Sequence, residues 1–177
     1  MGTVWRAEDL RLGAPVAVKL IHQRDVNDAE TLARFEAEAE IAAQLRSPHV
    51  VQVFDAGVDR ETGAPYIAME LLEGESLRER LARVRSIAPV ALVQIVSQVA
   101  RALTRAHELG IIHRDLKPAN VFLLRDGDVD VVKVLDFGIA KRSHSSRPEP
   151  TVTGDMLGTP TYMSPEQILS SKDVDRA

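Results

Sequence analysis

Cysteine is absent from this chain of 177 residues. Neither a disulfide nor a thiolate metal site can therefore form, and a reducing compartment is the expected environment. An excess of basic charge is also missing, because 22 Lys and Arg stand against 26 Asp and Glu, for a net charge of -4. This balance does not indicate a nucleic-acid-binding protein.

Long hydrophobic runs are missing as well. The most apolar stretch, "APVALVQIVSQVARAL", is interrupted by Gln94, Ser97, Gln98 and Arg101, so no membrane segment is predicted. Charged residues at positions 6, 8 and 9 argue against a signal peptide. With 45% hydrophobic and 27% charged residues, the composition is that of a globular chain, which we expect to be cytoplasmic.

The periodicity of the chain predicts strands first and helices later. Strands are expected over residues 15–22, 50–58, 66–72, 121–124 and 131–135. Helices are expected from residue 27 or 28 to Pro48, after a cap at Ser76, and from Pro89 to Leu109 with Gly110 closing the last one. This order predicts an α+β fold with a cleft between a strand-rich part and a helical part.

Two of these helices show an apolar face at helical spacing. The first is expected to bury Leu32, Phe35, Ala39, Ala42 and Leu45, and the long one Val96, Val99, Leu103 and Ala106.

The strongest chemical signal is the segment "IIHRDLKPANVFLL", which is expected to form a loop between a helix and a strand. Phosphoryl transfer needs a carboxylate to accept the proton of the incoming hydroxyl, a cation near the moving phosphate and an oxygen ligand for Mg²⁺. Asp115, Lys117 and Asn120 supply these three groups in that order. We interpret His113 as packing beside the loop.

A second signal, "KVLDFGIAK", follows sixteen residues after Asn120. Asp136 ends an apolar strand there, so its carboxylate is expected to enter the cleft and bind Mg²⁺, a hard cation that prefers carboxylate and phosphate oxygens. The segment "DGDVD" resembles the start of a calcium loop, but Val131 stands where such a loop needs glycine. It is therefore interpreted as a turn.

Together these motifs resemble those of eukaryotic-like (Hanks-type) protein kinases, most of all the bacterial serine/threonine branch. The resemblance runs from Gly2 to the end of the chain. It implies an incomplete two-lobed kinase fold, with residues 1–70 as a small β-rich N-lobe with one long helix and residues 71–177 as the start of a mostly helical C-lobe. It also implies ATP and Mg²⁺ as cofactors.

The resemblance implies a role for further residues near the nucleotide. Lys19 of "VAVK" matches the lysine that holds the α- and β-phosphates, and Glu38 matches its helical partner, with Glu36 and Glu40 as register alternatives. The remaining residues implied near ATP are Gly2 in the phosphate loop, Met69, Glu70 and Leu72 in the segment whose backbone binds adenine, and Val4, Ala17, Leu72 and Phe122 around the purine. Ser76 is expected to cap its helix or to contact the ribose, and capping is favoured.

The remaining implied sites concern regulation and substrate. Arg114 marks kinases that are activated by phosphorylation of the activation loop, where Thr151 and Thr153 are the expected acceptors. Thr159 and Glu166, in "LGTPTYMSPEQ", match the segment that docks the protein substrate.

The opening "MGTV" matches the last four positions of the kinase glycine loop, so Met1 is expected to be an internal residue of a longer protein. The chain is likewise expected to stop before the central helix of the large lobe, which predicts marginal stability and weak or no activity for the chain alone. The sequence does not indicate whether the longer protein carries a membrane anchor.

The function expected from the resemblance is an ATP-dependent protein serine/threonine kinase whose partners are protein substrates. Autophosphorylation of the activation loop is expected as well. Nucleic acid is not an expected partner, and the oligomeric state is open. The alternatives are a catalytically inactive nucleotide-binding or scaffold fragment, and a small-molecule kinase of related fold.

Overall fold

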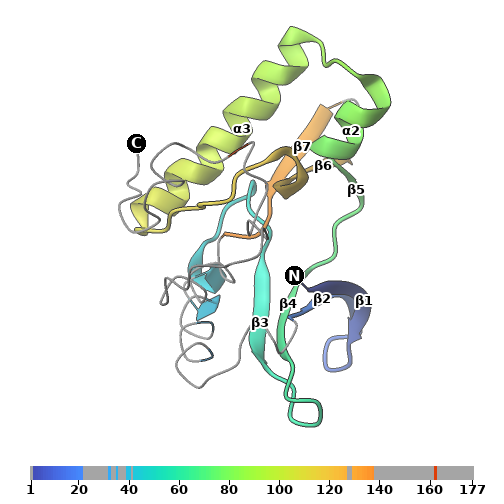
Figure 1. Ribbon diagram of the computed structural model, residues 1–177, viewed down its shortest axis with the longest axis vertical. Helices are drawn as coiled ribbons and strands as arrows, with labels where there is room; N and C mark the ends of the chain where they lie inside the picture. Colours follow the sequence, from blue (N-terminus) through green and yellow to red (C-terminus); the bar gives the residue numbers. More distant parts are fainter. Residues whose placement is uncertain are drawn as a thin grey trace, which may run out of the picture.

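The computed structural model describes residues 2–21, 32, 35, 39–40, 42–126, 129–137 and 162. In the part of the chain that these ranges cover, two antiparallel sheets and the helices α2 and α3 carry the fold (Figure 1).

The first sheet has four antiparallel strands in the order β1-β2-β4-β3. Their bounds are Thr3–Asp9 for β1, Ala14–Leu20 for β2, Val53–Val58 for β3 and Pro65–Glu70 for β4. The three strands predicted here are confirmed with shifted ends, while β1 was not predicted.

One face of this sheet packs on helical residues that precede β3. Phe35, Ala39 and Ala42 are buried there against Ile67 and Val53 of the strands. Residues 32, 35, 39–40 and 42–44 are helical, which confirms the predicted apolar face at these positions, whereas residues 45–47 are not helical, so the helix ends earlier than the predicted Pro48. This packing fixes the sheet that carries Lys19.

The second sheet has three strands in the order β5-β6-β7. They run over Gly74–Ser76, Val121–Asp126 and Val129–Val134. The strand predicted from Val50 begins only at Val53, because the residues before it pair with β7 instead. Val51 N–H donates to Val134 O (3.0 Å), and Val134 N–H donates to His49 O (2.8 Å). Residues 49–51 therefore join the two sheets.

Helix α2 (Leu77–Val84) begins at the predicted cap Ser76. The Ser76 hydroxyl accepts from Glu79 N–H (3.2 Å), and the Glu79 carboxylate accepts from Ser76 N–H (2.8 Å). This reciprocal pair is a capping box, which satisfies two backbone donors that the first turn leaves without helical partners. The expectation of capping is thus confirmed.

Arginines fasten α2 to the second sheet. The Arg80 guanidinium donates to both carboxylate oxygens of Asp130 on β7 (2.9 and 3.1 Å) and to Glu75. Arg83 also donates to Glu75 (2.6 Å). Hydrogen bonds from Arg83 and then Arg80 lower the pKa of Glu75 to about 2, so this carboxylate stays charged at neutral pH.

Helix α3 (Pro89–Glu108) begins with proline at its first position, where the missing N–H costs no helical bond. At its other end Gly110 takes φ 74°, Gly110 N–H donates to His107 O (3.0 Å) and Ile111 N–H to Ala106 O (2.9 Å). This is a Schellman motif, in which the left-handed residue is most often glycine. The predicted closing role of Gly110 is confirmed.

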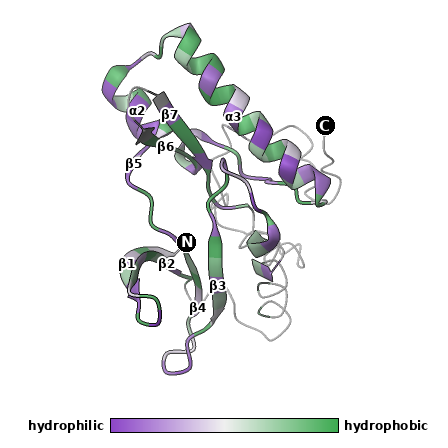
Figure 2. Ribbon diagram, turned by 180° about the vertical axis from the view of Figure 1, so that it is seen from behind, coloured by the Kyte–Doolittle hydropathy of each residue, from purple (hydrophilic) through white to green (hydrophobic). Residues whose placement is uncertain are grey.

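The buried face of α3 agrees with the prediction at three of its four positions, Val99, Leu103 and Ala106, but not at Val96. Ile95, Ala102 and Ala106 are buried against β6 and β7, while Val96 is 56% exposed. Val96 was therefore wrong as a core residue, because Ile95 next to it takes the inward position. Figure 2 shows the alternation of hydrophobic and hydrophilic residues along α3.

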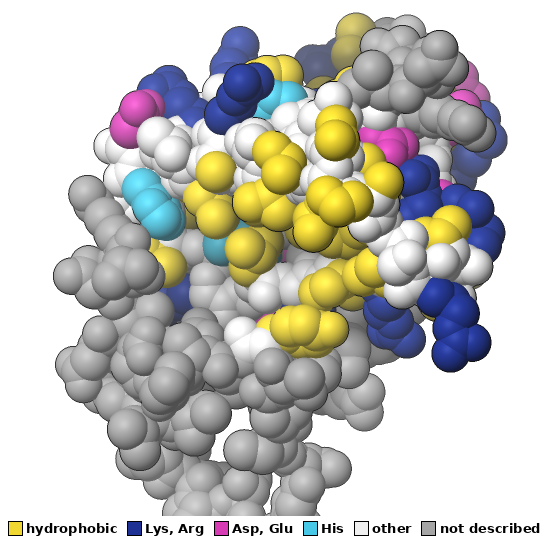
Figure 3. Space-filling model, turned by 90° about the horizontal axis from the view of Figure 1, so that it is seen from above, with side chains coloured by type: hydrophobic (Ala, Val, Ile, Leu, Met, Phe, Trp, Pro, Cys, Tyr) yellow, Lys and Arg dark blue, Asp and Glu magenta, His cyan; other side chains and the backbone are white. Residues whose placement is uncertain are grey.

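The outward side of α3 keeps apolar residues in contact with solvent. Val90 and Val93 are 73% and 64% exposed. Figure 3, seen from above, shows hydrophobic side chains gathered on this face. No helix in the described ranges combines the length and apolar character that crossing a bilayer requires.

Candidate active site

The predicted catalytic loop leaves α3 and turns sharply at Arg114. Asp115 N–H donates to His113 O (2.8 Å), which closes a three-residue turn around Arg114 with φ 59°. A positive φ at a residue other than glycine is costly and is found most often at functional sites, where the surroundings enforce it. Here it places Asp115 directly after the turn.

The three predicted catalytic residues lie in contact. Lys117 Nζ donates to Asp115 Oδ2 (2.9 Å), and the Asn120 amide donates to Asp115 O (2.9 Å). Asn120 is itself buried, and its N–H donates to Lys117 O (2.8 Å) at the short 3-10 helix η2 (Pro118–Asn120). The loop therefore holds a carboxylate, a cation and an amide as one rigid group.

His113 is buried beneath this loop. Its Nδ1 accepts from Asp115 N–H (3.2 Å), which leaves Nε2–H to donate to Leu135 O (2.8 Å). Burial lowers the pKa of His113 below its ordinary value of 6.5, because a charged ring would lose its hydration. The ring also packs against Phe137, with centroids 4.8 Å apart. The prediction that His113 packs beside the loop agrees with this position.

Leu135 connects the loop to Asp136. Its C=O accepts from His113, and its N–H donates to Asn120 O (2.9 Å). Both backbone groups of the residue before Asp136 are thus tied to the loop. Asp136 follows with φ 53°, so a strained positive φ stands at Asp136 itself and at Arg114, the residue before Asp115.

Lys19 and Asp136 form a direct ion pair. Lys19 Nζ donates to Asp136 Oδ1 at 2.6 Å, across 117 positions of sequence, with the two side chains 19% and 45% exposed. Glu38, predicted to pair with Lys19, lies outside the described residues. The pair places the lysine of the first sheet beside the carboxylate that follows the second.

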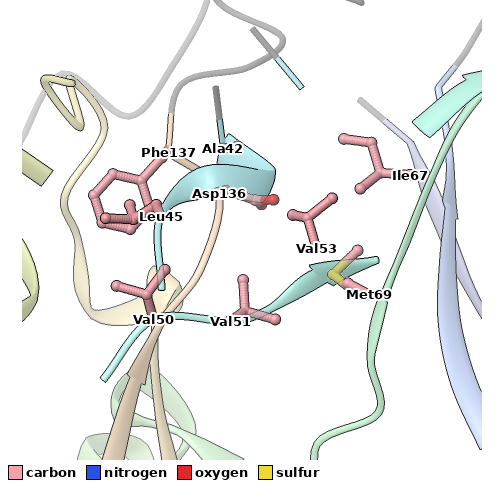
Figure 4. A pocket seen from close by; sticks show the side chains of 9 residues that line it. All are labelled: Ala42, Leu45, Val50, Val51, Val53, Ile67, Met69, Asp136 and Phe137. Carbon is pink, nitrogen blue, oxygen red and sulfur yellow. The ribbon is translucent and has the colours of Figure 1, made fainter. Parts of the chain in front are cut away.

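An apolar pocket lies behind this ion pair (Figure 4). Eight of its nine lining residues are apolar, among them Met69, Val53 and Phe137, and Asp136 is the exception. Of the residues predicted to surround the nucleotide, Met69 and Asp136 line this pocket.

The remaining residues predicted around the purine lie on separate elements. Ala17 on β2 is the register partner of Met69 on β4, and Val4 on β1 is the partner of Lys19. Phe122 on β6 stands opposite Lys133, and Leu72 follows β4. Register partners on antiparallel strands share a face, so Val4, Ala17 and Met69 lie on the Lys19 face of the sheet. Their contact with a purine stays a prediction.

Gly2 approaches the backbone of β2. A Cβ at this position would lie 2.1 Å from Leu20 O, a distance at which atoms collide. Packing alone thus requires glycine at the place where the resemblance implies a phosphate loop.

The side chain of Glu70, a residue predicted to bind adenine through its backbone, forms hydrogen bonds of its own. Its Oε1 accepts from Lys133 Nζ (2.7 Å) on β7 and from Gln52 N–H (2.7 Å). Neither contact was predicted, because neither residue stands in a motif. Among the other predicted sites, Thr151, Thr153, Thr159 and Glu166 lie outside the described residues.

The donor set fits a hard divalent cation bound together with phosphate. Asn120 turns its amide nitrogen toward Asp115, which leaves the amide oxygen as the group for a cation, and Asp136 presents a partly exposed carboxylate. In the described ranges no three His, Cys, Asp or Glu side chains gather as a metal site. One carboxylate and one amide suit Mg²⁺ that takes its other ligands from phosphate and water.

Comparison with known proteins agrees with this geometry. A family model for the protein kinase domain matches residues 1–177. Serine/threonine-protein kinase pkn3 of Myxococcus xanthus is 45% identical, over 97% of this chain and 32% of the relative. PknL of Mycobacterium tuberculosis is 40% identical, over 94% of this chain and 40% of that protein. The chain therefore spans two fifths or less of these relatives.

Solved structures show the same architecture. The kinase domain of Mycobacterium tuberculosis PknI matches with a TM-score of 0.68 and 37% identity, over 78% of this chain and 55% of that one. Rad53 1-466 in complex with AMP-PNP matches with a TM-score of 0.74 and 29% identity, over 97% of this chain and 40% of that one. With its whole length matched by the family model and its catalytic loop assembled as that family requires, the chain belongs to the protein kinase family.

Proposed function

We propose that this chain is the catalytic part of a serine/threonine protein kinase that transfers the γ-phosphate of Mg-ATP to protein hydroxyls. One observation carries the proposal: Asp115, Lys117 and Asn120 are held in mutual contact, and Leu135 ties them to Asp136 and its partner Lys19. The relatives are named serine/threonine-protein kinases, and one matched structure holds AMP-PNP, which supports a nucleotide substrate.

Each residue has a defined role in this proposal. Asp115 orients the substrate hydroxyl and accepts its proton, and Lys117 stabilises negative charge on the transferred phosphoryl group. Lys19 binds the nucleotide phosphates after their negative charge has displaced Asp136 as its ion-pair partner. Asn120 and Asp136 would hold Mg²⁺, which neutralises charge on the phosphates when bound.

The proposal is tested by transfer of labelled γ-phosphate to a mixture of basic proteins, followed by phosphoamino-acid analysis. We expect a low yield of phosphoserine or phosphothreonine with the unaltered chain, and a further loss of about 10²- to 10⁴-fold in Asp115→Asn, which keeps the shape but removes the base. Asp55→Asn is the matched control, because this exposed carboxylate accepts from Tyr66 (2.8 Å) on the first sheet, on a strand that carries none of the proposed catalytic residues.

Two results would contradict the proposal. Equal transfer by the unaltered chain and by Asp115→Asn would show that the labelled phosphate is not transferred at the Asp115 site. Binding of Mg-ATP without any transfer would identify the chain as a nucleotide-binding scaffold instead.

A further inference from the structure

Lys133 occupies an unusual place for a lysine, inside the second sheet. Its side chain is only 14% exposed, whereas lysine side chains usually remain in water. Its Nζ donates to Glu70 Oε1 (2.7 Å) and lies 3.4 Å from Val50 O. The ammonium group therefore reaches from β7 to the end of β4 in the first sheet and to residues 49–51, which join the two sheets.

Glu70 completes this connection from the other side. The same Oε1 that receives Lys133 also accepts from Gln52 N–H (2.7 Å), and Glu70 N–H donates to Gln52 O (2.9 Å). Glu70 is thus fixed through both its backbone and its side chain. It is also the last residue of β4 and part of the segment whose backbone the kinase resemblance implies binds adenine.

The position of Lys133 in the chain adds a second link. It lies three residues before Asp136 on the strand that ends at Val134. The Glu70–Lys133 ion pair therefore links the adenine-binding segment to the strand that precedes the Mg²⁺ ligand, in addition to the backbone bonds of residues 49–51. The two groups that must bind opposite ends of one nucleotide are held in register through it.

We propose that the Glu70–Lys133 pair acts as a clamp that positions the adenine-binding segment relative to Asp136, so that the two are positioning residues for Mg-ATP. The inference rests on the proposed kinase function. A partly buried ion pair contributes little net stability, because desolvation of the two charges offsets their attraction. Its main effect is therefore on geometry, which governs nucleotide affinity.

The test compares Lys133→Met with the unaltered chain. We expect the KM for Mg-ATP to rise about three- to tenfold, with kcat changed less than about twofold, since the clamp touches no reacting atom. Amide hydrogen exchange without nucleotide is expected to become faster at residues 50–53 and 69–72. Lys133→Arg, which keeps the charge, is expected to retain a KM close to that of the unaltered chain.

Two further variants separate the clamp from other effects. Arg105→Met is the matched control, because it removes the exposed Arg105–Glu108 pair (2.7 Å) on α3 and is expected to leave KM unchanged. Glu70→Gln/Lys133→Met removes both charges without restoring the link. If its KM stays raised, the lost link is responsible; if KM returns to the original value, an unpaired carboxylate caused the change and the proposal fails.

The remaining outcomes are equally decisive. An unchanged KM in Lys133→Met, or a higher kcat, would overturn the clamp while leaving the kinase function intact. A lack of turnover in the unaltered chain would overturn the kinase function and this role with it. Lys133→Gln, which keeps a polar side chain, replaces the methionine variant if that variant does not fold.

Discussion

His113 is the residue on which the catalytic loop and the segment before Asp136 both depend. One ring nitrogen accepts from Asp115 N–H and the other donates to Leu135 O. Only the neutral ring can do both, since a charged ring carries a proton on each nitrogen. Protonation would therefore break the bond to Asp115 N–H and place a charge in a buried site.

This requirement predicts a pH dependence of stability. The pKa of His113 is lowered in the folded chain, so between that pKa and about 6.5 the unfolded chain binds more protons. We expect the free energy of unfolding contributed by His113 to be complete above pH 6.5 and to fall as the pH drops below it. Urea unfolding of the chain and of His113→Gln across pH 5 to 8 checks this. If the free energy of unfolding changed equally with pH in the unaltered chain and in His113→Gln, the prediction would be contradicted.

The contacts of Lys19 show where residue-level prediction from sequence stops. Asp115, Lys117 and Asn120 stand within six positions, so their proximity could be predicted from a single loop. Lys19 and Asp136 are 117 positions apart, and no local pattern indicates that they meet. The pairing of Glu70 with Lys133 is likewise set by how two sheets pack, which spacing alone does not encode.

At the scale of elements, the ends of the helices are determined by few residues. Ser76 and Glu79 begin α2 with two reciprocal hydrogen bonds, and Gly110 ends α3. These positions were predictable, because capping depends on residue type at fixed offsets.

Removal of the Ser76 cap tests this directly. We expect Ser76→Ala to lower the free energy of unfolding by about 1 kcal/mol, because Glu79 N–H loses its acceptor. Ser97→Ala, the same substitution on the exposed side of α3, is expected to be neutral or slightly stabilising, since alanine favours a helix interior. Thermal or urea unfolding followed by circular dichroism measures both. An equal effect in the two variants would show that capping is not the cause.

The elements that sequence reasoning missed are those with weak patterns. β1 carries Arg6, Glu8 and Asp9, so hydrophobic alternation is lost along it, and β5 has only three residues. The predicted face of α3 was wrong at one position, because Ile95 and Val96 are both apolar and either fits the periodicity. Only the position of β7 decides which of them is buried.

At the scale of the whole molecule, the site is assembled from both sheets. Lys19 comes from the first and Asp136 from the end of the second, so a ligand that contacts both stabilises their association. A ligand present at a hundred times its dissociation constant adds about 2.7 kcal/mol to the stability of the state that binds it.

We therefore expect Mg-ATP to raise the melting temperature of the chain. In Asp136→Ala the rise should be largely lost, because Asp136 both pairs with Lys19 and is the proposed Mg²⁺ ligand. Asp55→Ala, which removes an exposed carboxylate from the first sheet, should keep it. Differential scanning fluorimetry with and without Mg-ATP checks this. An undiminished rise in Asp136→Ala would place the nucleotide elsewhere.

Residues 49–51 have a consequence for how the chain can be divided. They precede β3 in sequence, yet they hydrogen-bond to Val134 at the end of β7. A polypeptide cut after residue 70 would leave this strip without its partner, although the cut falls between the two sheets. The two sheets are thus joined by backbone hydrogen bonds. We expect their amide protection against hydrogen exchange and their resistance to proteases to be lost together, as in one cooperative unit.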